Sequence, residues 1–315
     1  MGMTPAGRSV AEAGPMQAPL SPSGEQVELA LGEHRAVVVG VGAGLRTYSF
    51  GERPVLDGYG AAELSSSGRG QLLVPWPNRI EDGRYEFDGR SHQLPLDEPE
   101  RRNAIHGLTR WAHWSVADRA ADRVALEHVL YPRPGYPFSL ALRVEYSLSD
   151  DGLTVRTEAT NIGSDSAPYG AGSHPYLAID HDVVDAVELT VPAATVLLAD
   201  ERGIPGGSGP VAHEGLDFRE SRAIGSIKLD HCFTDLERES DGRARVGVGT
   251  TTLWADESYP YVMIFTGDGL PDVERRSVAV EPMTCAPNAF RSGESLVRLE
   301  PEESHVACWG ISPSR

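Results

Sequence analysis

The chain has 315 residues and a formal net charge of −18, because 46 acidic side chains outnumber 28 basic ones. Phosphate backbones and anionic bilayers repel so acidic a protein, so we expect neither nucleic acid nor a membrane as partner. The three cysteines, Cys232, Cys285 and Cys308, are odd in number and lack C-x-x-C spacing, which argues against a disulfide framework or a zinc site. Because no apolar stretch near the first residues resembles a signal peptide, we expect a cytoplasmic protein.

The chain divides into a short leading segment and one long domain. Residues 1–24 are rich in Ala, Pro, Gly and Ser, a composition that buries too little apolar surface to offset ordering. We therefore predict a flexible N-terminal tail over 1–24. Residues 25–315 show short strand patterns without an internal linker, which predicts a single domain.

The strand patterns follow one another with turn residues between them. Asp88-Gly89 stands between alternating segments and predicts a hairpin. Residues 138–148 alternate apolar and polar side chains, and Asp151-Gly152 turns the chain into a further strand over 153–160. The other expected strands are 28–31, 36–41, 45–50, 186–191, 244–254, 261–265, 277–280, 295–299 and 304–309, with a glycine-rich surface loop near 203–209. Short strands at this spacing predict an all-β sandwich or barrel.

Five short segments carry polar groups suited to binding or protonating a sugar. In chain order they are Pro75-Trp76-Pro77-Asn78-Arg79-Ile80, Asn103-Ala104-Ile105-His106-Gly107, Ser173-His174-Pro175-Tyr176, Leu229-Asp230-His231-Cys232-Phe233 and Val280-Glu281-Pro282-Met283.

Two histidines stand beside turn residues, His106 before Gly107 and His174 before Pro175. Such positions present a side chain at a strand end or in a loop. Histidine titrates near neutrality and can therefore give or take a proton at working pH. For any one of ten histidines a structural role is the more common one, so the flanking motifs are what single out these two.

Glu281 ends the apolar run Ser277-Val278-Ala279-Val280 and precedes a proline. A carboxylate in that position is costly unless it has partners or a task, and burial there would raise its pKa as a general base requires. An arbitrary Glu at a strand end would more often be a solvated one.

The remaining polar groups suit sugar binding. Asp230 can accept hydrogen bonds from vicinal hydroxyls, and Arg79 offers a planar fork of donors, with Asn78 as a second donor. Tyr176 can cover an apolar sugar face, although aromatic residues more often lie in the core. The neighbouring His231 and Cys232 do not make a metal site with Asp230, because ligand number and spacing are insufficient.

Together and in this order, the five segments resemble the aldose 1-epimerase (mutarotase) family, from about Val27 to Trp309. The resemblance implies a large antiparallel β-sandwich with a sugar site in a cleft on one sheet and no cofactor or metal. It implies that His174 is the general acid and Glu281 the general base, with His106 contributing to both catalysis and binding. Substrate-binding residues would be Asn78, Arg79, His106, Tyr176 and Asp230.

Three functions remain open at this stage. An aldose 1-epimerase acting on a free hexose is favoured over a non-catalytic sugar-binding protein, because binding alone does not need both His174 and Glu281. An epimerase for a 6-phospho or 6-sulfo hexose would need a local cationic cluster, for which Arg101 and Arg102 lie close in sequence to His106. We expect a small-molecule sugar as partner and a monomer or homodimer.

Overall fold

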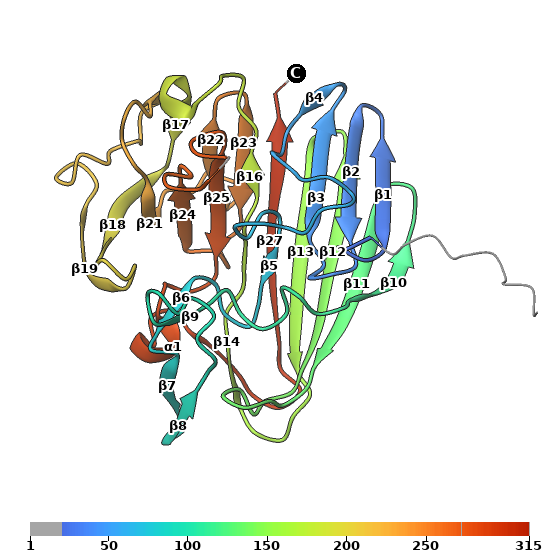
Figure 1. Ribbon diagram of the computed structural model, residues 1–315, viewed down its shortest axis with the longest axis vertical. Coiled ribbons are helices and arrows are strands. Elements are labelled where there is room, and N and C mark those ends of the chain that lie inside the picture. Colours follow the sequence, from blue (N-terminus) through green and yellow to red (C-terminus); the bar gives the residue numbers. More distant parts are fainter. Residues whose placement is uncertain (1–20, 272, 315) are drawn as a thin grey trace, which may run out of the picture.

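The computed structural model describes residues 21–271 and 273–314, and its elements are almost all strands (Figure 1). Within these residues every strand pairing is antiparallel. The prediction of an all-β fold built from antiparallel sheets is therefore confirmed. None of the helices in this part of the chain has the length and apolar character needed to cross a bilayer.

The largest sheet has nine strands, in the order β10 (Ser115–Arg119), β11 (Arg123–Leu130), β12 (Leu140–Ser149), β13 (Gly152–Asn161), β27 (Ser304–Pro313), β23 (Thr251–Ala255), β22 (Ala244–Val248), β17 (Glu188–Thr190) and β20 (Arg222–Ala223). Its central hairpin, β12–β13, follows from the sequence. Alternate residues of β12 are buried, as a half-buried strand requires, and Ser149 pairs with Gly152 across a two-residue turn.

The second sheet has eight strands, in the order β19 (Pro205–Pro210), β18 (Ala193–Ala199), β21 (Asp230–Leu236), β24 (Tyr261–Phe265), β25 (Val278–Met283), β15 (Gly172–Ser173) and β5 (Leu72–Leu73), with β16 (Tyr176–Leu177) also paired to β25. All six residues of β25 are buried. This strand therefore has both faces covered, which explains why its residues other than Glu281 are apolar.

The smaller elements complete the layers. A four-stranded sheet contains β1 (Gln26–Leu31), β2 (His34–Val39), β3 (Leu45–Phe50) and β4 (Arg53–Pro54). Three strand pairs join β6 (Arg79–Glu81) to β9 (Asn103–Ile105), β7 (Arg84–Phe87) to β8 (Arg90–Gln93), and β14 (Ala167–Tyr169) to β26 (Val297–Leu299). In the described part of the chain, the helices are a 3₁₀ turn, η1 (Val184–Ala186), and one short helix, α1 (Ala289–Ser292). In the turn of the β7–β8 hairpin, Asp88 and Gly89 have φ of 48° and 71°, the left-handed backbone that an Asp-Gly hairpin turn uses.

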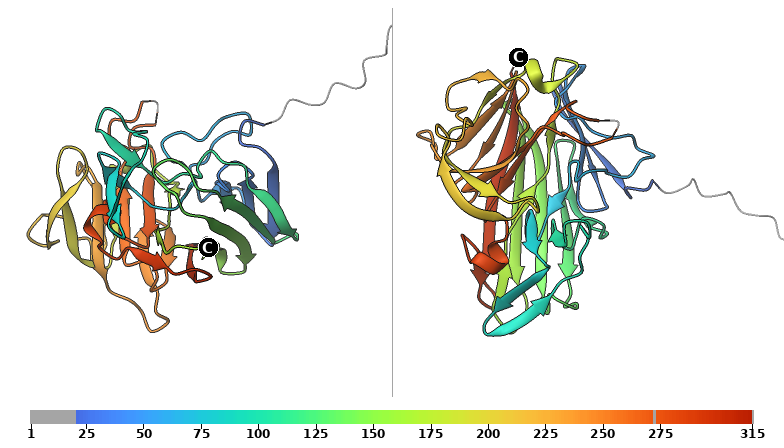
Figure 2. Two further views of the ribbon diagram at one scale, coloured as in Figure 1. Left: turned by 90° about the horizontal axis from the view of Figure 1, so that it is seen from below. Right: turned by 60° about the vertical axis from the view of Figure 1, so that its left-hand side comes forward.

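The sheets pack as layers around one continuous apolar core. Figures 1 and 2 show β1–β3 against the half of the large sheet that holds β11 and β12, and the eight-stranded sheet beside the half that holds β22 and β23. Buried side chains from all three sheets belong to the same core cluster. A second small cluster lies within the eight-stranded sheet and the loop that follows β25: Leu197, Cys232, Tyr261, Met263, Met283 and Ala286.

Three expectations need correction. The predicted loop over 203–209 is largely the edge strand β19, whose glycines and prolines are tolerated because one side of an edge strand is unpaired. The single strand expected over 244–254 is the hairpin β22–β23. Residues 21–24 of the predicted tail pack onto the domain, because the Val41 N–H donates to the Ser23 carbonyl and Ser23 is buried. Residues 1–20 lie outside the described part of the chain.

Candidate active site

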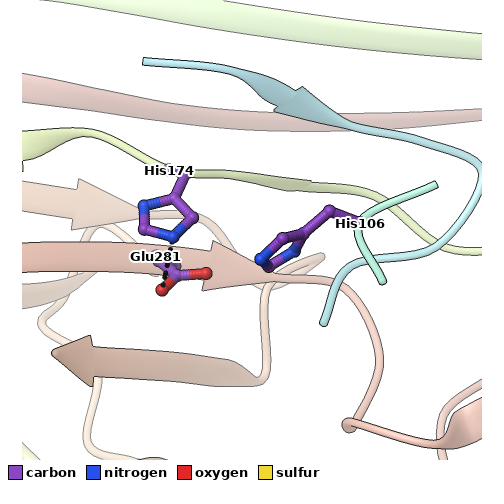
Figure 3. Close-up of side chains that lie close together, drawn as sticks. All are labelled: His106, His174 and Glu281. Atoms are coloured by element: carbon purple, nitrogen blue, oxygen red, sulfur yellow. Dashed lines mark ion pairs between the residues drawn. The ribbon is translucent and has the colours of Figure 1, made fainter. Parts of the chain in front are cut away.

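Strand pairing places His174 opposite Glu281. In β25, Ala279 pairs with Tyr176 of β16 and Met283 pairs with Gly172 of β15, so the register on both sides of the break between β15 and β16 sets His174 across from Glu281. The two side chains meet, with 3.3 Å between His174 Nε2 and Glu281 Oε1 (Figure 3). Two segments about a hundred residues apart therefore bring an imidazole and a carboxyl into contact because their strands are neighbours.

His106 reaches the same point from a different pair of strands. Arg79 of β6 pairs with Ile105 of β9, which joins the first two motif segments. The Asn78 N–H donates to His106 Nδ1 at 3.2 Å, and the His106 N–H donates to the Asn78 carbonyl at 2.9 Å. Because Nδ1 accepts a hydrogen bond, the neutral ring carries its proton on Nε2. The rings of His106 and His174 are 5.3 Å apart and nearly perpendicular (Figure 3).

Burial controls the electrostatics of this group, since His106, His174 and Glu281 are at most 8% exposed. Burial lowers the pKa of His174 to about 3, with the positive charges of Arg110, Arg69 and Arg79 acting in the same direction. Burial also lowers the pKa of His106 well below its ordinary value. Burial raises the pKa of Glu281 well above its ordinary range, as does the negative charge of Asp230, while Arg79 opposes the rise.

Several buried polar atoms at this point lack a hydrogen-bond partner among residues 21–271 and 273–314. They are Ser173 Oγ, His174 Nδ1 and Glu281 Oε2. Buried polar groups are normally paired, and each exception calls for an explanation. Three exceptions, on β25 and on the adjoining β15–β16 segment, mark a place where a polar ligand or water would supply the missing partners.

Arg79 and Asp230 lie beside this group, on the wall of a small cavity. The cavity is about 20 Å³ in volume and is lined by Asn78, Arg79, Leu197, Ala199, Gly203, Pro205, Asp230, Cys232, Met263 and Pro287. Arg79 is held by Glu98, which accepts from Nε at 2.9 Å and from Nη2 at 3.0 Å. Its Nη1 makes no hydrogen bond to any described residue and so remains available as a donor. Asp230 is exposed at the start of β21.

Tyr176 lies directly against His174. The two rings are 5.0 Å apart and inclined by 12°, and the Tyr176 hydroxyl donates to the Ser67 carbonyl at 3.0 Å. The ring is 2% exposed. Trp76, the other aromatic residue of the first motifs, packs edge-on against Phe290 in the core.

The same three side chains are a possible set of metal ligands, since ligand atoms of His106, His174 and Glu281 all lie within 4.8 Å of one another. Two imidazoles and a carboxylate suit zinc or a similar ion. Arg69, Arg79 and Arg110 nevertheless place positive charge around the imidazoles, which disfavours a further cation.

Sequence reasoning missed three cationic or anionic neighbours of the site: Arg69, Arg110 and Glu98. None stands in a distinctive motif, and only the fold brings them near the histidines. Arg101 and Arg102, which an epimerase for an anionic hexose would use, do not form a free cationic cluster with Arg79. Arg101 lies 3.9 Å from Glu98, the carboxylate that Arg79 also uses, whereas the Arg102 side chain is 72% exposed and pairs with Asp82.

Comparisons with known proteins show the family and the fold of the chain. The sequence model of the family described as aldose 1-epimerase matches residues 25–310. The uncharacterized protein YihR of Escherichia coli (strain K12) is 37% identical over 297 residues, which cover 93% of this chain and 94% of YihR. The galactose mutarotase of Rattus norvegicus is 30% identical over 216 residues, covering 61% of this chain and 60% of the rat protein.

Solved structures share the fold. A GalM/aldose epimerase homologue from C. elegans superposes with a TM-score of 0.81 at 18% identity, covering 92% of this chain and 99% of that one. A galactose 1-epimerase from Lactobacillus acidophilus NCFM gives a TM-score of 0.77 at 20% identity, with coverage of 92% and 95%.

Proposed function

We propose that this chain, which belongs to the aldose 1-epimerase family, is an active mutarotase that interconverts the α and β anomers of a free hexose. The observation that carries the proposal is the buried contact between His174 and Glu281, 3.3 Å apart, with unpartnered polar atoms on both residues. Opening a sugar ring needs one group that removes the proton of the anomeric hydroxyl and one that protonates the ring oxygen. A pair of this kind supplies both.

The pair is poised to exchange a proton. Burial favours the neutral form of each side chain, an uncharged imidazole facing a protonated carboxyl. That state holds as many protons as an imidazolium facing a carboxylate. One proton transfer across the contact therefore yields His174 as general acid and Glu281 as general base. Such a coupled pair titrates as a unit.

The reaction then runs in two halves. Glu281 takes the proton from the anomeric hydroxyl while His174 protonates the ring oxygen, and the ring opens to the free aldehyde. Rotation about the C1–C2 bond presents the other carbonyl face, and the same two groups act in reverse to close the ring. General acid or base action typically contributes roughly 10²–10⁴-fold. His106, whose Nε2 carries the proton, is placed to donate to a sugar oxygen beside His174.

The residues around the cavity would hold the sugar. The cavity is smaller than a hexose, so we place the ring above it, toward the exposed Asp230, with Asp230 accepting from hydroxyls. Arg79 Nη1 and Asn78 are the donors on the same wall. In this arrangement Tyr176 supports the site from behind His174, and its contact with the sugar, expected from the sequence, stays a prediction.

We propose a neutral hexose as the preferred substrate, because the arginines nearest the cavity are already paired with a carboxylate. Glu98 balances Arg79 within a bidentate contact, Arg101 shares the same carboxylate, and Asp230 adds negative charge. The net charge of −18 also repels anionic sugars at long range. A 6-phospho or 6-sulfo hexose remains the alternative, and it would have to bind Arg79 Nη1 or draw Arg101 away from Glu98.

Polarimetry on freshly dissolved α-anomers tests the proposal. Glucose, galactose, glucose 6-phosphate and a 6-sulfonated glucose are compared in one buffer, each against its uncatalysed rate. We expect acceleration of the neutral hexoses and a kcat/KM lower for the anionic ones. A preference of about tenfold or more for an anionic sugar would contradict the proposal of a neutral substrate but not the proposal of an epimerase. Binding without acceleration of any sugar would instead indicate the non-catalytic sugar-binding protein.

The roles of the two histidines are separable by kinetics. His174→Asn removes the acid and is expected to lower kcat with little change in KM. His106→Asn removes a donor that also holds the sugar, so KM is expected to rise as well. The pH profile of His174→Asn should lack the limb at which the pair loses its proton. Full activity of both variants would move the site elsewhere.

A metal-free reaction is part of the same proposal. Prolonged dialysis against a chelator, followed by metal analysis, is expected to leave the rate unchanged. Loss of activity on chelation, restored by zinc, would instead assign His106, His174 and Glu281 as ligands.

A further inference from the structure

The ring of Tyr176 contacts two side chains, His174, which takes part in the proposed reaction, and Arg69, which does not. The His174 imidazole stacks with it, and the guanidinium carbon of Arg69 lies 4.2 Å from the same ring centre. A guanidinium over an aromatic face is a favourable cation–π contact, strongest where water is excluded. Arg69 is 3% exposed, so this contact is formed inside the protein.

Arg69 is fixed from behind by a network that does not reach the sugar cavity. Its Nε donates to the Asp57 carbonyl and its Nη2 to Asp57 Oδ2, both at 2.9 Å. Asp57 also accepts from Arg276 Nη2 at 2.9 Å and from the Ser277 hydroxyl at 2.8 Å. Arg69 does not line the cavity. Its position is therefore set by contacts within the fold.

The residues next to Arg69 form a close-fitting seat for His174. The Gly70 N–H donates to the His174 carbonyl at 2.9 Å, and the His174 N–H donates to the Gln71 carbonyl at 3.0 Å. At Gly68, with φ of 75°, an added Cβ would lie 2.6 Å from His174 Cδ2. Only glycine allows the backbone to approach the imidazole this closely.

From these contacts we propose that Arg69 is a positioning residue, which acts through the Tyr176 ring to hold the His174 imidazole opposite Glu281 with a fixed positive charge behind it. The inference rests on the proposed function, in which His174 is the acid. An imidazole clamped between a glycine backbone and a supported ring keeps Nε2 in contact with Glu281. Precise orientation of reacting groups contributes a large part of the rate enhancement of an enzyme.

Besides burial, the positive charge of Arg69 lowers the pKa of His174. The groups that act on His174 are Glu281 and His106 in the site, Tyr176 beside it, and Arg110, Arg69 and Arg79 around it. Burial is the main cause of the lowered pKa of His174, and the arginines add to it. Removing Arg69 therefore raises this pKa, and the pair should lose its proton at higher pH.

Arg69→Gln tests this inference, with Arg276→Gln as the matched control. Both variants remove an arginine from Asp57, but only Arg69 contacts the Tyr176 ring. For Arg69→Gln we expect kcat about tenfold lower, KM within about twofold, and the basic limb of the kcat profile at higher pH. For Arg276→Gln we expect wild-type kinetics. Arg69→Lys keeps the charge but not the planar contact, so the limb should return to its wild-type pH while kcat recovers only in part.

A second readout does not depend on catalysis. The imidazole nitrogens of ¹⁵N-labelled His174 report its protonation and its contact with Glu281 by NMR, and they should shift in Arg69→Gln and stay in place in Arg276→Gln. If wild type accelerates no sugar but these resonances shift, the proposed function fails and the positioning role stands. A folded Arg69→Gln with wild-type kcat, pH profile and resonances overturns the role.

A second pair of variants covers the case in which Arg69→Gln does not fold. Tyr176→Phe keeps the ring that joins Arg69 to His174 and loses only the hydroxyl bonded to Ser67, whereas Tyr176→Leu removes the ring. Tyr176→Leu is expected to have at least a threefold lower kcat than Tyr176→Phe and the larger displacement of the His174 nitrogens. Equal kcat and equal spectra for the two variants overturn the inference.

Discussion

Two strands show how differently this chain builds its scaffold and its site. In β12 every second residue is buried, and its charged residues Arg143 and Glu145 are on the more exposed face. In β25 all six residues are buried, and one of them is Glu281. The first strand obeys the rule that charges face solvent, and the second breaks it once.

The comparison separates residues that stabilise the fold from a residue that serves the proposed reaction. Burying a carboxyl costs free energy unless it is paired or neutralised, so β25 would be more stable without one. Among the residues that the structure describes, the Glu281 carboxyl makes its one polar side-chain contact with His174, and its Oε2 has no hydrogen-bond partner. The proposed reaction would explain why the strand accepts this cost. Variants in the two strands should accordingly fail in different ways.

Glu281→Gln is expected to have the largest effect on activity. Glutamine keeps the shape but cannot accept the anomeric proton, so kcat should fall roughly 10²–10⁴-fold with sugar binding largely retained. Polarimetry and calorimetric binding measure the two quantities. Glu158→Gln in β13, a partly exposed carboxylate paired with Arg156, is the matched control and should keep the wild-type rate. Equal rates for the two variants would contradict the assignment of the base.

Leu140→Ala in β12 is expected to show the opposite pattern. Leu140 is fully buried in the core, so its truncation should lower the free energy of unfolding by about 2–5 kcal/mol. Its kcat, measured well below the unfolding transition, should stay at the wild-type value. Urea denaturation and polarimetry on one preparation test both. A selective loss of kcat in this variant would show that the scaffold and the site are not separable in the way that β12 and β25 suggest.

The buried carboxyl also predicts how stability depends on pH. The folded state raises the pKa of Glu281 above its ordinary 4.5, so above that pH the folded state keeps a proton that the unfolded chain releases. The cost of folding with Glu281 therefore grows as pH rises through 4.5 toward the folded pKa, by at most about 1.4 kcal/mol per pH unit. Glutamine has no such cost.

Unfolding free energies of wild type and Glu281→Gln between pH 5 and 8 measure this difference. The glutamine variant should be the more stable, by an amount that increases with pH. A difference that does not change with pH would mean that the folded pair holds no proton in this range, so that an ionised Glu281 faces a neutral His174.

The same two strands show what sequence could predict. The alternation over 138–148 identifies β12 because one face of that strand meets solvent, and the five motif segments named His174, Glu281 and their companions. Periodicity could not place Arg69 or Glu98, because single charged residues in loops carry no pattern until the fold brings them together. The glycine content of residues 203–209 led to the wrong prediction of a loop. Most of this segment is the strand β19, because backbone hydrogen bonds between strands do not depend on side chains.

The smallest effect concerns the N-terminus, where composition predicted a flexible tail over 1–24. Deleting residues 1–20, which carry no site residue, should change neither activity nor melting temperature. Deleting 1–24 also removes Ser23, whose hydroxyl accepts from Gln26 Nε2 and whose carbonyl accepts from Val41 N–H, both at 2.9 Å. That deletion should cost about 1 kcal/mol of stability. Ser23→Ala, which removes only the side-chain bond, should lie between the two. Equal melting temperatures for both deletions would show that residues 21–24 add nothing to the fold, and a loss in the shorter one would show that the tail packs.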